Sequence, residues 1–373
     1  MIPVVVGLAV IWTVLQTLNP IFLSSANLVN LLLDMSAIGI VALGIVCVLL
    51  VGQIDLSVGS VSGVSGAVLA VLFVTKGWPA WLAILVTVVM GAVIGWIYAQ
   101  LFNRFGVPSF VITLAGLLTF LGLQIYVLPK GAINLPFDSG LVAFAQLDFV
   151  PPWLSYALVA VAAVWMFVTG FLHARERRAA SLSARSTAAL AVRSGALLVV
   201  LGFVAWYLNQ TRGVGWLFVL FLSLVLVVHY FLSRTKWGRS VYAIGGNVEA
   251  ARRAGINVRA VFTSVFVLCS TFAAVGGILV ASRLAAANQS NGTGDFNLNA
   301  IAAAVIGGTS LFGGRGSAWG ALLGMIVIQS ISSGLTLLNL DSSIRYVVTG
   351  IVLLLAVIVD SVARKSRTSH GRA

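Results

Sequence analysis

The chain has 373 residues, of which 60% are hydrophobic and only 8% are charged. Soluble domains are about half apolar and about a quarter charged, so this composition excludes a soluble protein and is typical of an all-α polytopic membrane protein. The formal net charge is +13, but the basic residues lie in short stretches between apolar segments, so they indicate membrane topology rather than nucleic acid binding.

Apolar stretches of the length that crosses a bilayer recur along the whole chain. The candidate spans are residues 2–18, 36–51, 55–74, 80–102, 109–128, 153–172, 194–209, 215–233, 260–283, 299–312, 317–338 and 344–362. We therefore expect about 10–12 transmembrane helices, some of them broken, in a single domain over residues 1–373. The first stretch lacks the basic start and the cleavage site of a signal peptide, so it is interpreted as a span.

Two glycine-rich stretches resemble each other and predict an internal repeat. They are VGQIDLSVGSVSGVSGA, from Val51, and IGGTSLFGGRGSAWGA, from Ile306. The matched pairs are Gly52 with Gly307, Leu56 with Leu311, Gly59 with Gly314, Ser62 with Ser317, and Gly66-Ala67 with Gly320-Ala321. Many transporters are built from repeats whose broken helices meet at the transport path. The alternative is similarity of composition alone, and the relative orientation of the two halves stays open.

Three basic regions set the expected orientation in the membrane. They are a loop at 173–193, a loop at 234–259 and a tail at 364–373. Loops rich in arginine and lysine remain in the cytoplasm, so all three regions, and with them the C-terminus, are expected there. The stretch 299–338 must then cross the membrane twice or not at all, and a re-entrant pair of broken helices is equally compatible.

The second basic loop contains AIGGNVEAARRAGINV, which has the signals of a short helix. Gly245 and Gly246 are expected to break the incoming chain, and Asn247 is a suitable N-cap. Glu249 would lie in the first turn, where a carboxylate suits the helix dipole, and Gly255 would end the helix. The residues between them that are compatible with a helix are Ala250, Ala251, Arg252 and Arg253.

A helix this short is not stable alone, so it needs a surface on which to rest, either this chain or another protein. The alternative is a basic loop that fixes topology and touches lipid headgroups. That alternative explains the arginines but not the capping pattern, because topology requires only charge.

These segments together resemble the permease subunits of bacterial monosaccharide ABC importers, the ribose, xylose, arabinose and galactose class. The basic stretch is similar to their cytoplasmic coupling loop, and GQIDLSVGS, FGVPSFVITLAG and IGGTSLFGGRGS are similar to further family segments. The added length at 173–215 most resembles the xylose-type permeases, so xylose is the favoured sugar.

The resemblance implies a complex in the bacterial cytoplasmic (inner) membrane. A cytoplasmic ABC ATPase, which carries the ATP and Mg²⁺, would dock on the coupling loop of each of two copies of the permease. An extracytoplasmic binding protein would deliver the sugar. This chain would not be an enzyme and would hold no cofactor, and it has no G-x-x-x-x-G-K-[ST] phosphate-binding motif.

Polar residues within the spans are candidates for the sugar path, although each could equally be an interhelical hydrogen bond. They are Gln53, Thr113, Thr119, Gln124, Asn297, Asn299 and Gln329. Basic residues near the outer face are candidates for docking of the binding protein, with attachment to lipid headgroups as the alternative. They are Lys130, Arg212, Arg283 and Arg345.

Other classes of function remain possible at this point. A stand-alone ion-coupled secondary carrier would need ionisable residues within the membrane, and Asp34, Asp55 and the other acids are expected near span ends or in loops instead. A passive channel would not explain the capped basic helix. A membrane enzyme would need catalytic groups, and the sequence shows neither catalytic nor metal-binding spacing. Cys47 and Cys269 lie in apolar runs and are expected to be core residues.

Overall fold

The structure is a computed structural model that describes residues 2–128, 131–341, 343–344, 346–351, 354–355 and 358. In chain order its elements are α1 (Ile2–Leu18), α2 (Ser25–Leu50), α3 (Val58–Ala70), the π-helical turn η1 (Val71–Thr75), α4 (Ala80–Phe105), α5 (Ser109–Val127), β1 (Ala132–Asn134), α6 (Gly140–Val142), the π-helical turn η2 (Ala143–Leu147), α7 (Pro152–Ala179), α8 (Thr187–Leu208), α9 (Trp216–Arg234), α10 (Lys236–Gly246), α11 (Val248–Arg253), α12 (Val258–Leu284), β2 (Ala286–Asn288), α13 (Phe296–Ile306) and α14 (Ala318–Leu337). Within the described residues, nine helices are long and apolar enough to cross a membrane. The prediction of a helical polytopic membrane protein is confirmed.

Several predicted spans differ from the helices that form. The spans expected at 153–172 and 194–209 are α7 and α8, which run on to Ala179 and begin at Thr187, so most of the predicted basic loop at 173–193 is helical. The span expected at 36–51 is the second half of α2, which begins at Ser25. The span expected at 299–312 is α13, a helix of 11 residues. At 1.5 Å per residue, such a helix is roughly 16 Å long and cannot cross a bilayer. The predicted span at 344–362 lies partly outside the described residues, and the basic tail lies wholly outside them.

Helix α12 lies at the centre of the fold, in contact with α2, α3 and α4. Small residues allow these close contacts, as is usual between membrane helices. On α4, Gly91 and Gly95 face α12, and a Cβ added at either position would overlap backbone atoms of Ser270 or Phe266. Both cysteines are free and buried in this core, as predicted.

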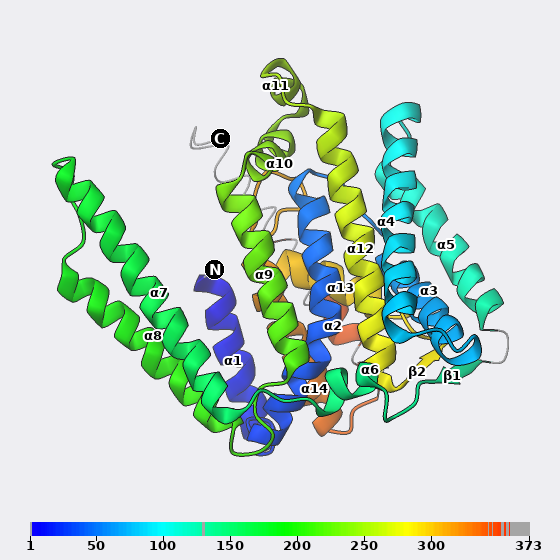
Figure 1. The fold of residues 1–373 in the computed structure, drawn as a ribbon, viewed down its shortest axis with the longest axis horizontal. Coiled ribbons are helices and arrows are strands. Elements are labelled where there is room, and N and C mark those ends of the chain that lie inside the picture. The colour runs from blue at the N-terminus through cyan, green and yellow to red at the C-terminus, as the bar shows by residue number, and fades with distance from the viewer. Residues whose placement is uncertain are drawn as a thin grey trace.

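Helices α7 and α8 form a hairpin at the edge of the molecule (Figure 1). Little of their surface is buried, and the connection to the body is at the end where α7 begins and α8 ends. There the Ser25 hydroxyl donates to the carbonyl of Leu208, and the Tyr207 hydroxyl donates to the carbonyl of Leu23. The hairpin accounts for most of the added length noted in the sequence, and it has the peripheral position expected of an insertion.

A two-stranded antiparallel sheet lies at the end of the molecule opposite α11 (Figure 1). In it, β1 and β2 pair with Ile133 opposite Ala287. Nearby, the buried Gln124 side chain donates through Nε2 to the carbonyls of Asn288 and Asn291, at 2.9 Å each. These bonds fix the chain that leads from α12 into α13.

Two units share the order helix, glycine-containing break, helix. In the first, α2 and α3 flank residues 51–57, and in the second, α13 and α14 flank residues 307–317. The two breaks are adjacent, because the Gly314 amide donates to the Leu50 carbonyl at 2.9 Å. Both breaks thus lie at the same end of the fold. The residues paired in the sequence do not occupy equivalent positions in the two units. Gly59 lies inside α3, whereas Gly314, its match in the sequence, lies in the second break.

Candidate functional site

The short helices α10 and α11 stand at one end of the molecule, beyond α9 and α12, which they connect (Figure 1). Each of the two has a side-chain cap. The Thr235 hydroxyl accepts from the Gly238 amide at the start of α10, and the Asn247 Oδ1 accepts from the Ala250 amide at the start of α11. Such caps satisfy backbone donors that a helix leaves free at its first turn. The predicted N-cap is therefore confirmed.

The charged residues of α11 pair with one another on its exposed surface. Glu249 lies in the first turn and makes ion pairs with Arg252 at 3.0 Å and Arg253 at 3.6 Å. The next turn ends at Gly255, whose φ of +80° is the left-handed conformation that glycine adopts readily. Ala251 is buried against the protein. The outcome is a compact helix with one face on the protein and a charged face directed outward.

The two glycines before α11 do not break the chain as predicted. Both belong to α10, and the turn comes at Asn247, which has an extended backbone. The reason is a close contact, because a Cβ on Gly245 would overlap the carbonyl oxygen of Leu50 and the amide nitrogen of Gly314. At Gly246 there is open space for a Cβ. Gly245 therefore serves packing and not chain reversal.

Through α10, this end of the molecule rests directly on both breaks. Gly245 contacts Leu50, which borders the first break, and Gly314, which lies in the second. The Tyr242 hydroxyl donates to the Gly316 carbonyl at 2.9 Å. Burial, together with the nearby Cys47, raises the pKa of Tyr242 above its ordinary value, so the phenol stays protonated and can donate. No sequence pattern predicts these contacts, since they join residues far apart in the chain.

A groove of ≈ 390 Å³ lies beside α11. It is lined by Trp237, Ser240, Ala254, Gly255, Ile256, Asn257, Ala260, Val261 and Ser264. The Trp237 indole donates to the Ser264 hydroxyl at 2.8 Å, which holds α10 against α12 at the base of the groove. The protruding helix and the adjacent groove together form a surface suited to contact with another protein.

The residues proposed for a sugar path differ in burial and in their hydrogen-bond partners. Thr113 and Gln124 are buried and bond to backbone carbonyls, Thr113 Oγ1 to Ser109 at 2.9 Å. Asn297 donates through Nδ2 to the Leu56 carbonyl at 2.7 Å. Thr119 is exposed on α5 and donates to Ala115. The remaining three, which are half-buried or buried, are Gln53, Asn299 and Gln329.

The extended segment of the first break lies among polar groups. The Ile54 amide donates to the Ser109 hydroxyl at 3.4 Å, and the Asn297 side chain donates to the Leu56 carbonyl. Asp55 is only 1% exposed, and its Oδ1 accepts from the amide and the hydroxyl of Ser57 at 2.8 Å and 2.7 Å. Asp55 therefore lies near span ends as expected, between α2 and α3, but its burial was not predicted. Its carboxyl group is inside the protein.

The basic residues proposed near the outer face are engaged within the chain where the structure describes them. Arg283 pairs with Asp34 at 2.9 Å, between the end of α12 and α2. Arg212 donates to the Asn30 side chain and lies over the Phe149 ring, 5.2 Å from its centre. The other two, Lys130 and Arg345, lie outside the described residues.

Comparison with known families matches residues 27–169 and 137–357 to the family described as "Branched-chain amino acid transport system / permease component". The xylose transport system permease protein of Escherichia coli (strain K12) is 37% identical over 372 residues, which cover 98% of this chain and 92% of that protein. The protein of the same name from Haemophilus influenzae is 34% identical, covering 92% of this chain and 91% of that protein. The ribose import permease protein of Escherichia coli (strain K12) is 31% identical, with coverage of 95% and 92%. No solved structure matches.

Proposed function

This chain belongs to the family of branched-chain amino acid transport system permease components, and on that premise we propose that it is the transmembrane subunit of an ATP-driven sugar importer. The family description names amino acids, but the relatives that match almost the whole chain are named for xylose and ribose. A monosaccharide is therefore the favoured cargo. Xylose is favoured among sugars, because the xylose proteins are more similar to this chain than the ribose protein.

The observation that carries this proposal is the arrangement of α10 and α11. A capped helix with a charged outer face protrudes at one end, and the helix before it contacts both glycine breaks. A cytoplasmic ATPase that grips α11 would displace α10, and α10 would press on the junction of Leu50 and Gly314. The ends of α2 and α13 would then move together, along with the attached helices α9 and α12. ATP binding and opening of the path would thereby be coupled in both directions.

The proposed importer also contains other subunits. The ATPase subunit would bind ATP and Mg²⁺, an extracytoplasmic sugar-binding protein would deliver the sugar, and a second copy of this chain would form the other half of the path. As a permease, this chain is a transport subunit and not an enzyme. It lies in the bacterial inner membrane with many crossings, and we propose that α11 and the C-terminus are on the cytoplasmic side.

Co-purification of the ATPase with tagged permease from membranes tests the proposal. We expect Glu249→Lys to abolish co-purification, while the matched variant Glu176→Lys, in the exposed last turns of α7, retains it. Glu249→Lys also removes two ion pairs inside α11, so the double variant Glu249→Lys/Arg252→Glu, which restores an internal pair, serves as a second probe. The double variant should also fail to retain the ATPase. An ATPase that stays bound to Glu249→Lys would contradict docking at α11.

A stand-alone ion-coupled sugar carrier is the alternative, and the buried carboxyl group of Asp55 is an observation in its favour. Carriers driven by ions use such groups within the membrane. The two functions differ in their energy source. Uptake by the proposed importer should stop when ATP is depleted and persist when an ionophore collapses the ion gradients, whereas a carrier should respond in the opposite way.

A further inference from the structure

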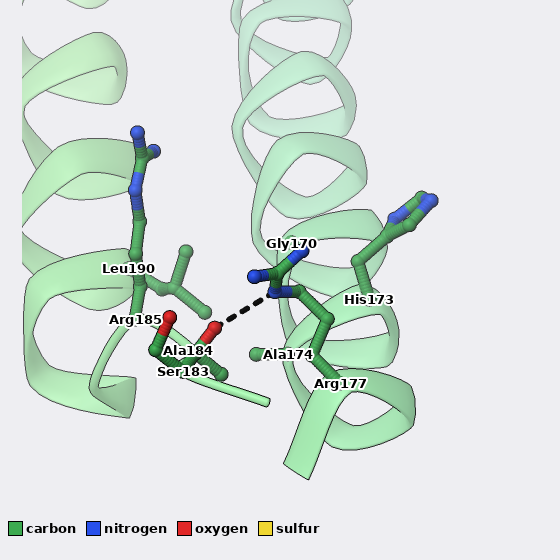
Figure 2. Close-up of a pocket in the computed structure, with 8 residues that line it drawn as sticks. All are labelled: Gly170, His173, Ala174, Arg177, Ser183, Ala184, Arg185 and Leu190. Carbon is green, nitrogen blue, oxygen red and sulfur yellow. Dashed lines mark hydrogen bonds between the residues drawn. The ribbon is translucent and has the colours of Figure 1, made fainter. Parts of the chain in front are cut away.

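A basic cavity lies between α7 and α8, at the free end of their hairpin. Its volume is ≈ 530 Å³. The residues that line it are Gly170, His173, Ala174, Arg177, Ser183, Ala184, Arg185 and Leu190 (Figure 2). The proposed transport function does not involve this cavity, since the loop that forms it is distant from α11 and from both breaks (Figure 1).

A hydrogen bond to the loop holds the guanidinium group of Arg177 across the cavity, and a second bond, from the neighbouring Arg178, helps to fix the loop. Arg177 donates through Nε to the Ser183 carbonyl at 2.8 Å, and Arg178 donates through Nη2 to the Arg185 carbonyl at 2.8 Å. In Figure 2 the Arg177 side chain reaches from α7 toward the loop, while the Arg185 side chain extends along α8. The bond from Arg177 uses only its Nε–H, so the terminal nitrogens of this group can still donate to an anion.

The charge around the cavity is not neutralised by the protein. Residues 173–193 contain five arginines and one acid, Glu176. The ion pairs among the residues that the structure describes involve Arg252, Arg253 and Arg283, and none of the five. An exposed excess of positive charge at the end of a membrane hairpin attracts anions.

Below the arginines, the cavity becomes apolar. Leu190 and Gly170 form its inner wall, where a Cβ added to Gly170 would lie 3.0 Å from the Leu190 side chain. The helices then present exposed apolar side chains along their length, such as Trp165 on α7 and Val199 on α8. A cation above an apolar surface suits a ligand with a phosphate at one end and hydrocarbon at the other, and a free phosphate would gain nothing from the apolar part.

We propose that this cavity binds the headgroup of an anionic phospholipid. The phosphate accepts hydrogen bonds from Arg177 and Arg185, and the acyl chains lie against the apolar surfaces of α7 and α8. Because the hairpin is attached to the body at its opposite end, a bound lipid would be its main support at this end. The inference does not depend on the sugar or on the ATPase, so it can fail while the transport function stands.

Native mass spectrometry of the purified full chain tests the proposal, with phosphatidylglycerol or phosphatidylcholine added in detergent micelles. Two arginines near an anionic headgroup together raise affinity by roughly thirtyfold, so Arg177→Gln/Arg185→Gln should weaken phosphatidylglycerol binding by about that factor. The control Arg175→Gln/Arg193→Gln removes equal charge outside the cavity and should change binding little. Phosphatidylcholine binding should be equal in all variants.

A second variant keeps every charge and fills the cavity. Gly170→Leu should weaken phosphatidylglycerol binding as well, because its side chain would occupy the apolar wall beside Leu190. Equal losses in the cavity and control arginine variants would overturn the proposal in favour of diffuse attraction to the loop. Displacement of phosphatidylglycerol by inorganic phosphate at equal concentration would overturn it in favour of a free anion.

Discussion

Asp55 lies in the break between α2 and α3, where Ser57 holds one oxygen of its carboxyl group through two hydrogen bonds. The Tyr98 hydroxyl in turn donates to the Ser57 hydroxyl at 2.9 Å, and the Cys269 thiol lies beside the carboxyl group. This cluster joins the break to α4 and α12. Its geometry accounts for Asp55 as a positioning residue that fixes the extended chain between two helices, without any role in ion transport.

Asp55→Asn separates the structural role from ion coupling. Asparagine keeps an acceptor for Ser57 but adds a buried NH₂ donor in place of the second carboxyl oxygen, so we expect this variant to lose roughly 1–2 kcal/mol of stability. That loss can be measured as a lower thermal midpoint in detergent. In vesicles with the ATPase and binding protein, uptake should still follow ATP and ignore an imposed proton gradient. Gradient-driven uptake that Asp55→Asn abolishes, and that the exposed control Asp148→Asn retains, would favour the secondary carrier.

The ion pair of Asp34 with Arg283 bears on docking at the outer face. Its groups are partly exposed, so its removal by Asp34→Ala should cost on the order of 1 kcal/mol in thermal unfolding. The exchange Asp34→Arg/Arg283→Asp should recover most of this loss. If Arg283 also contacts the binding protein, the exchanged variant will be stable but defective in sugar delivery. Normal sugar delivery by the exchanged variant would show that Arg283 does not contact the binding protein.

At the scale of single elements, the contact of α10 with the two breaks can be tested with adjacent glycines. Gly245→Ala places a Cβ against the backbone of Leu50 and Gly314. Overpacking of this kind costs about 1–3 kcal/mol, so we expect a lower thermal midpoint and a large loss of uptake. Gly246→Ala, at the last residue of the same helix, meets open space and should leave both the thermal midpoint and uptake nearly unchanged.

The outcome that would contradict this role of α10 is equal behaviour of the two alanine variants. Retention of the ATPase by Gly245→Ala is expected, because α11 and its cap are untouched. A variant that binds the ATPase but does not transport would locate the defect between docking and opening of the path.

Elements whose signals are local could be predicted from the sequence, and those fixed by distant contacts could not. The cap, acid and terminal glycine of α11 lie within nine residues, so they predicted the helix. The start of α2 was missed because Asn27, Asn30 and Asp34 look unsuited to a membrane helix. In the fold their partners are Ser333, Arg212 and Arg283, which come from α14, the loop after α8, and α12. Such partners satisfy polar groups that would otherwise be costly to bury.

The same distinction applies to the candidate site. The stretch that forms α11 could be selected from composition and capping alone. Its connection to the breaks depends on Gly245 meeting Leu50 and Gly314, which are far from it in sequence and carry no complementary side-chain chemistry. The only sign of such a backbone contact in the sequence is a glycine. Here that glycine is Gly245, which was interpreted as a chain break.

At the scale of the whole molecule, the fold divides into two ends. One end carries α11 and the free loop of the α7–α8 hairpin, and the other carries β1, β2 and α6 (Figure 1). The basic regions at 173–193 and 234–259 are therefore on the same side, which agrees with their common assignment to the cytoplasm. An orientation with α11 outside would place both in contact with the extracytoplasmic space, against the usual distribution of arginine.

Single cysteines at the two ends test this orientation in intact cells. The native Cys47 and Cys269 are buried, so their labelling by a membrane-impermeant maleimide should be weak. We expect Asp138→Cys, which is exposed near β1, to be labelled in intact cells. Leu182→Cys in the hairpin loop and Ala254→Cys beside α11 should react only after the membrane is permeabilised. Labelling of Ala254→Cys in intact cells would place α11 outside, where no ATPase could reach it, and would exclude the coupling mechanism proposed for α10 and α11.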